Sequence, residues 1–211
     1  LSVTGKDESA EFALERLAGN GITTDFLVDE SRPTTLKQRY RANGKTLLRV
    51  SHLREHDVSK DHIRTLLEKL KSHLEGANLV IFSDFNYGVL PQLLVDQIIK
   101  KCTERCIPMV ADSQSSSQMG NIARFNGMLL ITPTEYEARL AVKNNATSLT
   151  ILGEDLKAEA NASHVFVTLG AEGLLVCSEQ LSIGNSFTDQ LPALNTSPKD
   201  VSGAGDCLLT T

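Results

Sequence analysis

The sequence predicts an α/β protein built around a mostly parallel β-sheet. Along most of the 211 residues, short apolar runs typical of buried strands alternate with amphipathic segments of helical period. One Asn-Gly pair, Asn43-Gly44, lies between strand-like flanks and indicates a separate β-hairpin. A hydrophobic content of 41% is sufficient for a globular core in a chain of this length. We therefore expect a sheet covered by helices, with one hairpin flap beside it.

The first third of the chain is expected to hold two helices, a strand and the hairpin. Residues 6–19 carry apolar side chains at helical spacing and are followed by glycine, which predicts a helix. A short strand is expected at 26–28, and the hairpin over about 33–51 with a type I′ turn at its tip. Ser59 is a typical N-cap for the long amphipathic helix that follows and ends at Gly76.

From residue 79 onwards, strands and helices alternate regularly. The apolar run 79–83 is expected to be a strand buried on both faces. A helix is expected at 92–105. Four further strands are expected at 108–112, 128–132, 165–168 and 174–177. The strand at 128–132 runs into Pro133, a residue suited to the first turn of a helix, and the last two strands are close enough to be joined by a turn.

Composition excludes several classes of protein. With 26 acidic and 21 basic residues and a net charge of −5, the chain is not expected to bind nucleic acid or a membrane surface. No signal peptide or 18-residue apolar span is visible, so a soluble, cytoplasmic protein is expected. Four cysteines, Cys102, Cys106, Cys177 and Cys207, lack the spacing of a disulfide scaffold or a zinc site and are expected to be reduced thiols.

The segment Gly203-Ala204-Gly205-Asp206 carries the sharpest chemical signal. Small residues at a helix start let backbone N–H groups approach an anion, and the helix dipole favours negative charge there. An aspartate beside such a site makes sense if it takes a proton from a hydroxyl that attacks a phosphate. An ordinary glycine turn explains the same residues equally well.

Two more segments follow strand ends, where ligands bind in parallel sheets. Thr132–Ala138 puts Glu135 and Glu137 in a first helical turn, where carboxylates complement the dipole or hold a hydrated metal. Thr168–Gly173 has glycines that permit close approach of a ligand, although a plain hairpin turn also explains them. The chain lacks a G-x-x-x-x-G-K-[ST] loop and a G-x-G-x-x-G fingerprint after its first strand, which disfavours P-loop and dinucleotide-binding folds.

Taken in order, these segments resemble the ribokinase-like (PfkB) carbohydrate kinase family. The closing D-V-S-G-A-G-D is close to the carboxyl-terminal signature of that family. Thr168–Gly173 is similar to its T-x-G-x-x-G nucleotide loop, Thr132–Ala138 to its T-P-N-x-x-E-A segment, and Val3–Asp7 with Gly21-Ile22 to its V-G-x-D…G-V stretch. The resemblance implies a three-layer α/β/α fold with a mostly parallel sheet and a small β-hairpin lid.

Within the family, the heptose-phosphate kinase branch is the most similar. The similarity lies in Pro33–Arg39, Leu47–Val50 and Ser83–Leu90, the last resembling S-D-Y-x-K-G-x-L. Lys37, Arg39 and Arg49 place cations on the hairpin, suited to a phosphorylated sugar, although a solvated strand face is the alternative. Three positions depart from the pattern: Thr134 replaces an Asn of the family, and Tyr87 and Gln114 replace lysines of the heptose branch.

The resemblance implies a role for each matched residue in ATP-dependent phosphorylation of a sugar hydroxyl. Asp206 would be the general base, and the backbone N–H groups of Gly203, Ala204 and Gly205 would stabilise charge on the transferring phosphoryl group. Glu137 would position Mg²⁺ through water. The nucleotide side would be lined by Thr168, Gly170, Gly173 and Thr134, and the acceptor side by Lys37, Arg39, Arg49 and Asp84. The hairpin would also pair with a second copy of the chain.

Two other hypotheses remain open from the sequence. The departures at Thr134, Tyr87 and Gln114 fit a degenerate, non-catalytic relative that binds a nucleotide or sugar, and a dehydrogenase-like fold is weakened by the missing glycine fingerprint. The resemblance also implies that residues 1–211 form one kinase domain without its first strands and closing helices. Expressed alone, this chain is expected to be poorly stable or inactive.

Overall fold

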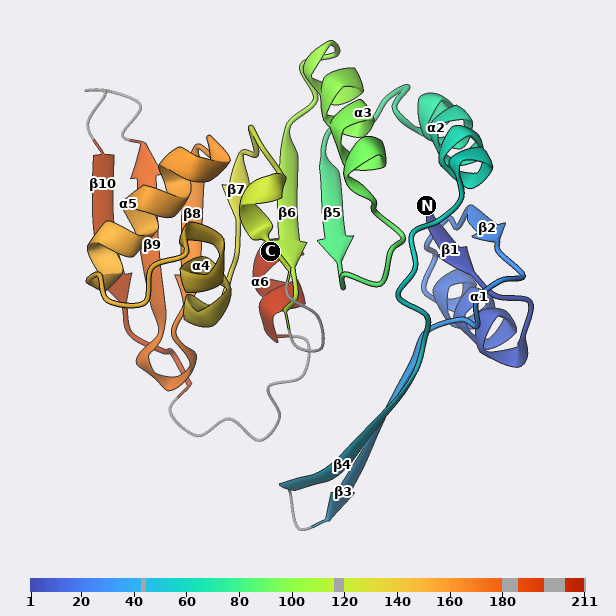
Figure 1. Cartoon of the computed structure of the whole chain (residues 1–211), viewed down its shortest axis with the longest axis horizontal. Helices are drawn as coiled ribbons and strands as arrows, with labels where there is room; N and C mark the ends of the chain where they lie inside the picture. Colours follow the sequence, from blue (N-terminus) through green and yellow to red (C-terminus); the bar gives the residue numbers. More distant parts are fainter. Residues whose placement is uncertain (43–44, 116–119, 180–185, 196–203, 211) are drawn as a thin grey trace. The chain divides into compact units, whose positions relative to one another are not determined.

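The computed structural model describes residues 1–42, 45–115, 120–179, 186–195 and 204–210 (Figure 1). The chain divides into two compact units. The first contains Leu1–Gly76 and Tyr87–Leu94, and the second contains Ala77–Asn86 and Val95–Thr211. Each unit is described by itself below.

The first unit holds a small parallel strand pair, two helices and the hairpin. Their bounds are β1 Ser2–Thr4, α1 Glu8–Gly19, β2 Phe26–Val28, β3 Leu36–Ala42, β4 Lys45–His52 and α2 Lys60–His73. Asp7 caps α1 by accepting from the backbone N–H of Ala10, and Ser59 caps α2 as expected. The expected apolar stripe of α1 is only partly buried, because Ala10 is buried whereas Leu14 is 41% exposed.

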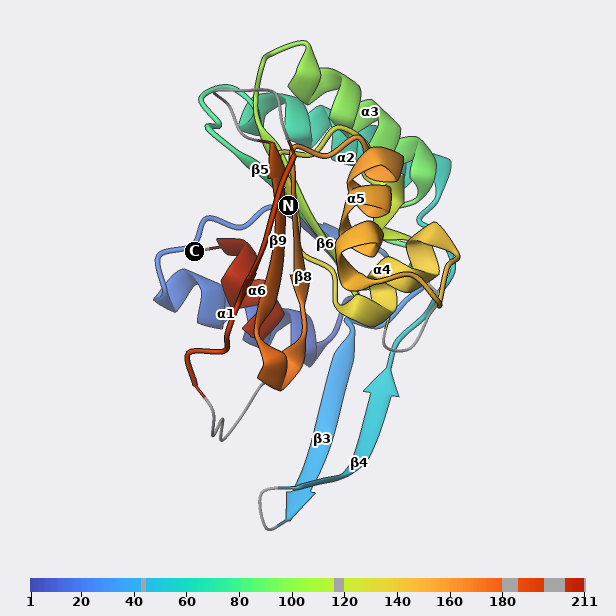
Figure 2. The ribbon, with the colours of Figure 1, turned by 90° about the vertical axis from the view of Figure 1, so that its left-hand side faces the viewer.

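The hairpin has one cationic face and one largely apolar face. In the β3–β4 register Lys37 lies opposite Ser51 and Arg39 opposite Arg49, and because side chains alternate along a strand these residues share a face. Tyr40 opposes Leu48 on the other face. Figure 2 shows β3 and β4 as a long antiparallel ribbon. The tip, Asn43-Gly44, lies outside the described residues, so the expected type I′ turn stays a prediction.

The second unit is built on a six-stranded sheet in the order β10-β9-β8-β7-β6-β5. Strands β5 to β8 run parallel, and β9 and β10 pair antiparallel to their neighbours. The strand bounds are β5 Val80–Asp84, β6 Met109–Ser113, β7 Leu130–Ile131, β8 His164–Thr168, β9 Leu174–Glu179 and β10 Ser186–Leu191. The expected mostly parallel sheet, and the turn between the strands at 165–168 and 174–177, are confirmed.

Helices cover both faces of this sheet. Their bounds are α3 Gln92–Thr103, α4 Glu135–Val142, α5 Leu149–Ala160 and α6 Ala204–Thr210, with short 3₁₀ turns at η1 Ile122–Arg124 and η2 Gly170–Glu172. Figure 2 shows α4 and α5 on one face and α6 on the other. The core between α5 and the sheet consists of fully buried side chains such as Leu152, Leu156, Val165, Val167 and Cys177. This is the three-layer α/β/α arrangement.

Two expectations about local structure are wrong. The strand at 79–83 is not buried on both faces: Phe82 is 3% exposed, but its neighbour Ile81 is 44% exposed, so only one face of β5 is covered. Pro133 is not in the first turn of a helix. It precedes Thr134, which takes the N-cap position, so that α4 starts only at Glu135.

Two elements of the second unit were not expected from the sequence. Helix α5 begins after a Ser148 N-cap, a signal that is visible in the sequence. Strand β10 has the sequence SFTDQL, which lacks a clear alternation of apolar and polar residues and acquires its strand geometry by pairing with β9.

Candidate active site

Polar side chains collect at the carboxyl edge of the sheet in the second unit. Asp84 ends β5, Asp112 and Ser113 end β6, and Thr132 follows β7. All four are buried, with 1–6% exposure. Because parallel strands end at the same edge, these groups and the loops that follow them form the natural ligand-binding edge of the sheet.

Asp84 lies in a closed network of hydrogen bonds. Its Oδ2 accepts from Arg124 at 2.7 Å and from the Ser113 hydroxyl at 3.2 Å, and its Oδ1 accepts from the backbone N–H of Asn86 at 2.9 Å. Asn86, held at φ +59°, donates its side-chain amide to Ser113 and to the carbonyl of Gln114. Asp84 thereby anchors the ends of β5 and β6 to each other.

Glu137 uses both carboxylate oxygens inside the protein. Its Oε2 accepts from the backbone N–H and the hydroxyl of Thr134, both at 2.8 Å, which completes a capping box at the start of α4. Its Oε1 accepts from the backbone N–H of Ser115 at 2.7 Å, across 22 residues of sequence. Two bonds fill the lone pairs of Oε2, but one bond leaves a second lone pair on Oε1.

Glu137 therefore fits a metal contact through water, but not direct ligation by both oxygens. One remaining acceptor position is enough for a hydrogen from a metal-bound water, the mode in which Mg²⁺ is often held. Within the described residues, no group of three or more His, Cys, Asp or Glu side chains is arranged to hold a metal ion. Glu135, the other first-turn acid, is bound to Arg139 at 2.7 Å.

The two glycines of the Thr168–Gly173 loop have different surroundings. Gly173 has φ +102°, and a Cβ there would collide with the carbonyl oxygen of Leu191, so the β8–β9 hairpin itself requires this glycine. Gly170 has φ +61°, and apart from its chain neighbours no atom in the described part of the chain lies within 4 Å of the position of a Cβ. Its backbone is open to close approach by a ligand. Thr168 forms a parallel bridge with Thr134, which joins this loop to the start of α4.

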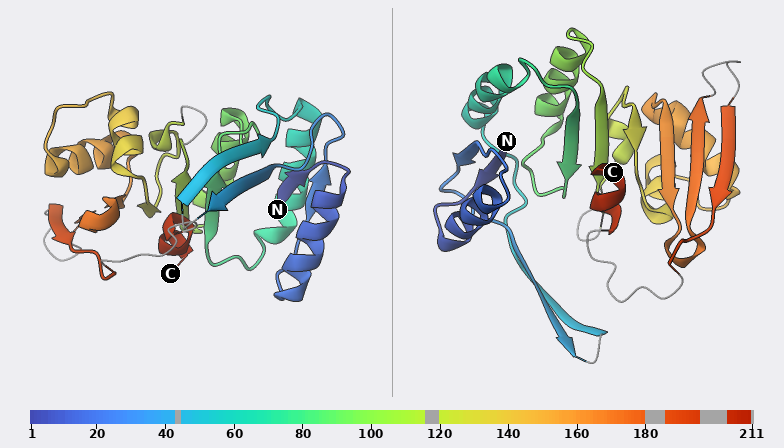
Figure 3. Two further views of the ribbon diagram at one scale, coloured as in Figure 1. Left: turned by 90° about the horizontal axis from the view of Figure 1, so that it is seen from below. Right: turned by 180° about the vertical axis from the view of Figure 1, so that it is seen from behind.

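Helix α6 lies at the same edge of the sheet. It contains Ala204, Gly205 and Asp206, and it lies against β6, near whose carboxyl end Figure 3 shows it from behind. Apart from its chain neighbours and the backbone of α6, no atom of the described residues lies within 4 Å of a Cβ position on Gly205. Gly203 and the side chain of Asp206 lie outside the described part of the chain, so their predicted roles stay predictions.

The predicted acceptor cations all belong to the first unit. Lys37 is half-buried, with its Nζ 5.0 Å from the centre of the Tyr87 ring. Arg39 and Arg49 are exposed and face each other directly across the hairpin. The structure therefore groups Lys37, Arg39 and Arg49 on one face, as the strand spacing predicts.

Comparison with known proteins identifies the family. The sequence profile of the pfkB family carbohydrate kinase matches residues 1–209, nearly the whole chain. The chain belongs to the pfkB family of carbohydrate kinases. Curated relatives of this pfkB chain include the bifunctional protein HldE of Geobacter sulfurreducens, 29% identical over 213 residues, and that of Sulfurimonas denitrificans, 27% identical. The alignments cover 99% of the present chain but only 41% and 42% of these relatives.

Solved structures of other kinases share the fold of the pfkB chain. Phosphofructokinase-2 from Escherichia coli, solved with substrates and products, superposes with a TM-score of 0.71 at 18% identity, covering 97% of this chain and 64% of the other. Ribokinase from Giardia lamblia gives 0.70 at 19% identity, with coverages of 99% and 62%. The expected ribokinase-like fold is thereby confirmed.

Two residues that bind the predicted site residues of the pfkB chain were not found from the sequence. Arg124 in η1 pairs with Asp84, and Ser115 donates to Glu137. Both contacts bridge 22 to 40 residues of sequence, and no motif marks either residue. The only available signal is that a buried carboxylate needs a partner, which does not say which residue supplies it.

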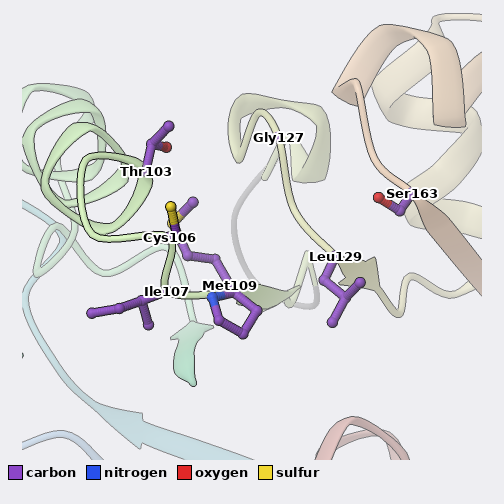
Figure 4. Close-up of a pocket in the computed structure, with 8 residues that line it drawn as sticks. Thr103, Cys106, Ile107, Met109, Gly127, Leu129 and Ser163 are labelled. Atoms are coloured by element: carbon purple, nitrogen blue, oxygen red, sulfur yellow. The ribbon is translucent and has the colours of Figure 1, made fainter. Parts of the chain in front are cut away.

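A shallow cavity of about 290 Å³ lies at the opposite edge of the sheet, away from these groups (Figure 4). It is lined mainly by the residues that precede β6 and β7, among them Cys106, Ile107 and Leu129. None of the predicted site residues lines it.

Of the helices that the structure describes, none has both the length and the apolar character needed to cross a membrane.

Proposed function

We propose that this chain transfers the γ-phosphoryl group of ATP to a hydroxyl of a sugar or sugar phosphate, with heptose 7-phosphate as the favoured acceptor. The observation that carries the proposal is the position of α6, which bears Asp206, at the carboxyl edge of the sheet. Glu137 and Thr168 lie at the same edge. The family match runs through both units, which supports a single ribokinase-like kinase domain. Because ATP is the proposed donor, the proposed place of action is the cytoplasm.

The proposed reaction is an in-line displacement at phosphorus. The acceptor oxygen forms a bond to the γ-phosphorus, the bond from that phosphorus to ADP breaks, and the hydroxyl proton passes to the carboxylate of Asp206. Backbone N–H groups of Gly203, Ala204 and Gly205 donate to the oxygens of the transferring group. Thr168, Gly170, Gly173 and Thr134 line the nucleotide side. Glu137 would hold Mg²⁺ through water, and the bound ion would neutralise part of the phosphate charge.

The cationic face of the hairpin supports an anionic acceptor. Arg39 and Arg49 are directly opposed, a like-charge pairing that destabilises a hairpin unless an anion lies between or beside the charges. Neither forms an ion pair with any residue that the structure describes. A phosphate group on the sugar would supply the missing charge, because guanidinium groups bind phosphate in bidentate fashion.

Replacement of the proposed base tests this function. In Asp206→Asn we expect turnover of heptose 7-phosphate with Mg-ATP to fall by about 10²- to 10⁴-fold, the contribution of a general base. Affinity for Mg-ATP, measured by titration calorimetry, should stay within about twofold, since the base contacts the acceptor. The matched control is Asp155→Asn, an exposed carboxylate on α5 that should leave turnover unchanged. Full turnover in Asp206→Asn would refute the assignment.

A non-catalytic nucleotide- or sugar-binding relative is the second candidate. It is favoured by two side chains that already bind other residues: Asp84 pairs with Arg124, and Glu137 belongs to the α4 capping box. The departures from the family pattern at Thr134 and Tyr87 also favour it. Calorimetric binding of Mg-ATP without phosphoryl transfer to any of a panel of sugars and sugar phosphates would decide for this candidate.

The hairpin is also the proposed contact with a second copy of the chain. Its apolar face carries Tyr40 at 52% exposure and, directly opposite, Leu48 at 55%. Exposed apolar side chains grouped in this way mark interaction surfaces. A homodimer through this face leaves the cationic face to the acceptor.

A further inference from the structure

Tyr87 is buried directly beneath a predicted acceptor cation. It follows β5 by three residues and is only 5% exposed. The Nζ of Lys37 lies 5.0 Å from the centre of its ring, within the range of a cation–π interaction. Both residues belong to the first unit. The aromatic ring of Tyr87 thus contacts the ammonium group of Lys37.

The backbone that carries this ring is held on both sides. The carbonyl of Tyr87 accepts from Arg32 at 3.0 Å, and Arg32 also donates to the carbonyl of His56 at 2.6 Å and pairs with Asp29 at 2.9 Å. Arg32 itself is 7% exposed, so these bonds are shielded from water.

The next residue adds a second restraint. Gly88 has φ +76°, and a Cβ there would collide with the carbonyl of His56. Its own carbonyl accepts from the backbone N–H of Val58 at 2.9 Å. The residues around position 87 are therefore packed against the segment that follows β4, and the backbone that carries the ring is held in place.

An aromatic platform orders a lysine differently from a carboxylate. The ring attracts the ammonium group through its electron-rich face and adds no negative charge of its own. A lysine side chain otherwise samples many rotamers, and ordering it in advance removes an entropic cost of anion binding. Lys37 shares its strand face with Arg39 and Arg49, so the ordered charge adds to a cationic surface.

We propose that Tyr87 is a positioning residue that holds the Lys37 ammonium group where it meets the anionic group of the acceptor. The proposal rests on the proposed sugar-phosphate kinase function and deepens it by naming what orients one of the cations. Tyr87 acts through Lys37 and does not itself touch the acceptor. It therefore affects acceptors that carry a phosphate more than the same sugars without one.

Kinetics of paired variants of the whole chain test the proposal. Tyr87→Leu removes the ring and Tyr87→Phe keeps it. We expect Tyr87→Leu to raise the KM for heptose 7-phosphate about 2- to 30-fold, the range equivalent to a cation–π contact. Values of kcat and of the KM for ATP should stay near wild type, and Tyr87→Phe should restore the wild-type KM. Lys37→Met should match Tyr87→Leu, and the double variant should be no worse than Lys37→Met alone.

A matched control variant and an NMR measurement on the wild-type chain distinguish the proposed role of Tyr87 from a general loss of folding. Lys6→Met removes an exposed lysine of the same unit, paired only loosely with Glu30 at 3.8 Å, and should not change the KM. The ε-protons of Lys37 should show an upfield ring-current shift by NMR in the wild-type chain. An unshifted resonance there overturns the proposal without any variant.

Other outcomes also overturn it. They are an unchanged KM in Tyr87→Leu, additive effects of the Tyr87→Leu and Lys37→Met changes, or equal losses in the Leu and Phe variants. If the wild-type chain phosphorylates no acceptor, the proposed function fails. The proposed role of Tyr87 is then tested separately, by titration of the variants with inorganic phosphate. Weaker phosphate binding by Tyr87→Leu than by Tyr87→Phe then supports the proposal, and equal binding by both overturns it.

Discussion

Asp29 is a buried acid whose ionised form is stabilised by its neighbours. It lies just after β2 and is 4% exposed. Burial alone would raise the pKa of its carboxyl, but hydrogen bonds from Ser31 and from the guanidinium of Arg32 outweigh burial and lower the pKa from 3.8 to about 2. Nδ1 of His62 lies 3.6 Å from the same carboxylate. The ionised carboxylate of Asp29 binds the guanidinium of Arg32, and Arg32 in turn donates a hydrogen bond to the backbone carbonyl of Tyr87.

This arrangement predicts a specific loss of stability in acid. Because the pKa of Asp29 is lower in the folded than in the unfolded chain, its contribution is complete above about pH 4 and is lost as the pH falls through about 2. The shift corresponds to about 2 kcal/mol. Urea unfolding at a series of pH values should show this loss in the wild-type chain and not in Asp29→Asn.

At neutral pH, Asp29→Asn should reduce the free energy of unfolding by about 3–5 kcal/mol, because Arg32 is left as an uncompensated buried charge. The control is Asp61→Asn: Asp61 pairs with Arg64 at 2.6 Å, but its side chain is 84% exposed, so a change below about 1 kcal/mol is expected. If wild type and Asp29→Asn lose stability in parallel between pH 4 and 2, the acid dependence does not come from this residue.

At the scale of single elements, α4 shows how a departure from the family pattern is accommodated. Thr134 stands where the resembled family segment usually has Asn, and its hydroxyl accepts from the backbone N–H of Glu137 at 3.3 Å. Glu137 in turn accepts from the Thr134 backbone, so two N–H groups at the helix start are satisfied. The substitution therefore preserves the N-cap, since Thr and Asn both fill this position well.

We expect Thr134→Ala to reduce the free energy of unfolding by about 1 kcal/mol, because one helix N–H loses its acceptor. Thr134→Asn should remain within a few tenths of a kcal/mol of wild type. Thr150, an exposed residue of α5 whose N-cap is Ser148, provides the control, and Thr150→Ala should be nearly neutral. Chemical denaturation of the three variants measures these differences. Equal stability of Thr134→Ala and wild type would show that the capping box contributes nothing.

At the scale of the whole molecule, the hairpin is the feature with consequences for assembly. Its two strands bond mainly to each other, and its two faces differ in character. An isolated two-stranded hairpin is only marginally stable in water, so an exposed apolar face on it favours burial against a partner. A second copy of the chain offers the same face and suits an isologous contact.

This predicts a dimer that depends on the apolar face. Sedimentation or light scattering should show concentration-dependent dimers of the wild-type chain. The paired change Tyr40→Lys with Leu48→Glu should weaken dimerisation at least tenfold, while the new cross-strand charges keep the hairpin paired. Leu194→Lys changes a fully exposed apolar residue of the second unit and should leave the dimer intact. Unchanged dimers in the paired variant would exclude this face as the contact.

Much of the fold follows from patterns that act over a few residues. The Ser59 cap of α2, the strands of the parallel sheet, the hairpin at 33–51 and the turn at 168–174 all appear where the sequence predicts them. Caps, turns and hydrophobic periodicity depend on near neighbours in the chain, which is why they are visible without a structure. The order of the motifs likewise suffices to predict the family.

The pairing of side chains was decided only by the tertiary structure. The sequence by itself placed Asp84, Glu137 and Lys37 near strand ends or on a strand face. Their partners Arg124, Ser115 and Tyr87 lie 40, 22 and 50 residues away and come together through strand order and loop closure. A buried charge requires a partner, but the local sequence does not specify which one. For the same reason only the folded chain shows Ile81 exposed at the sheet edge and Gly173 pressed against Leu191.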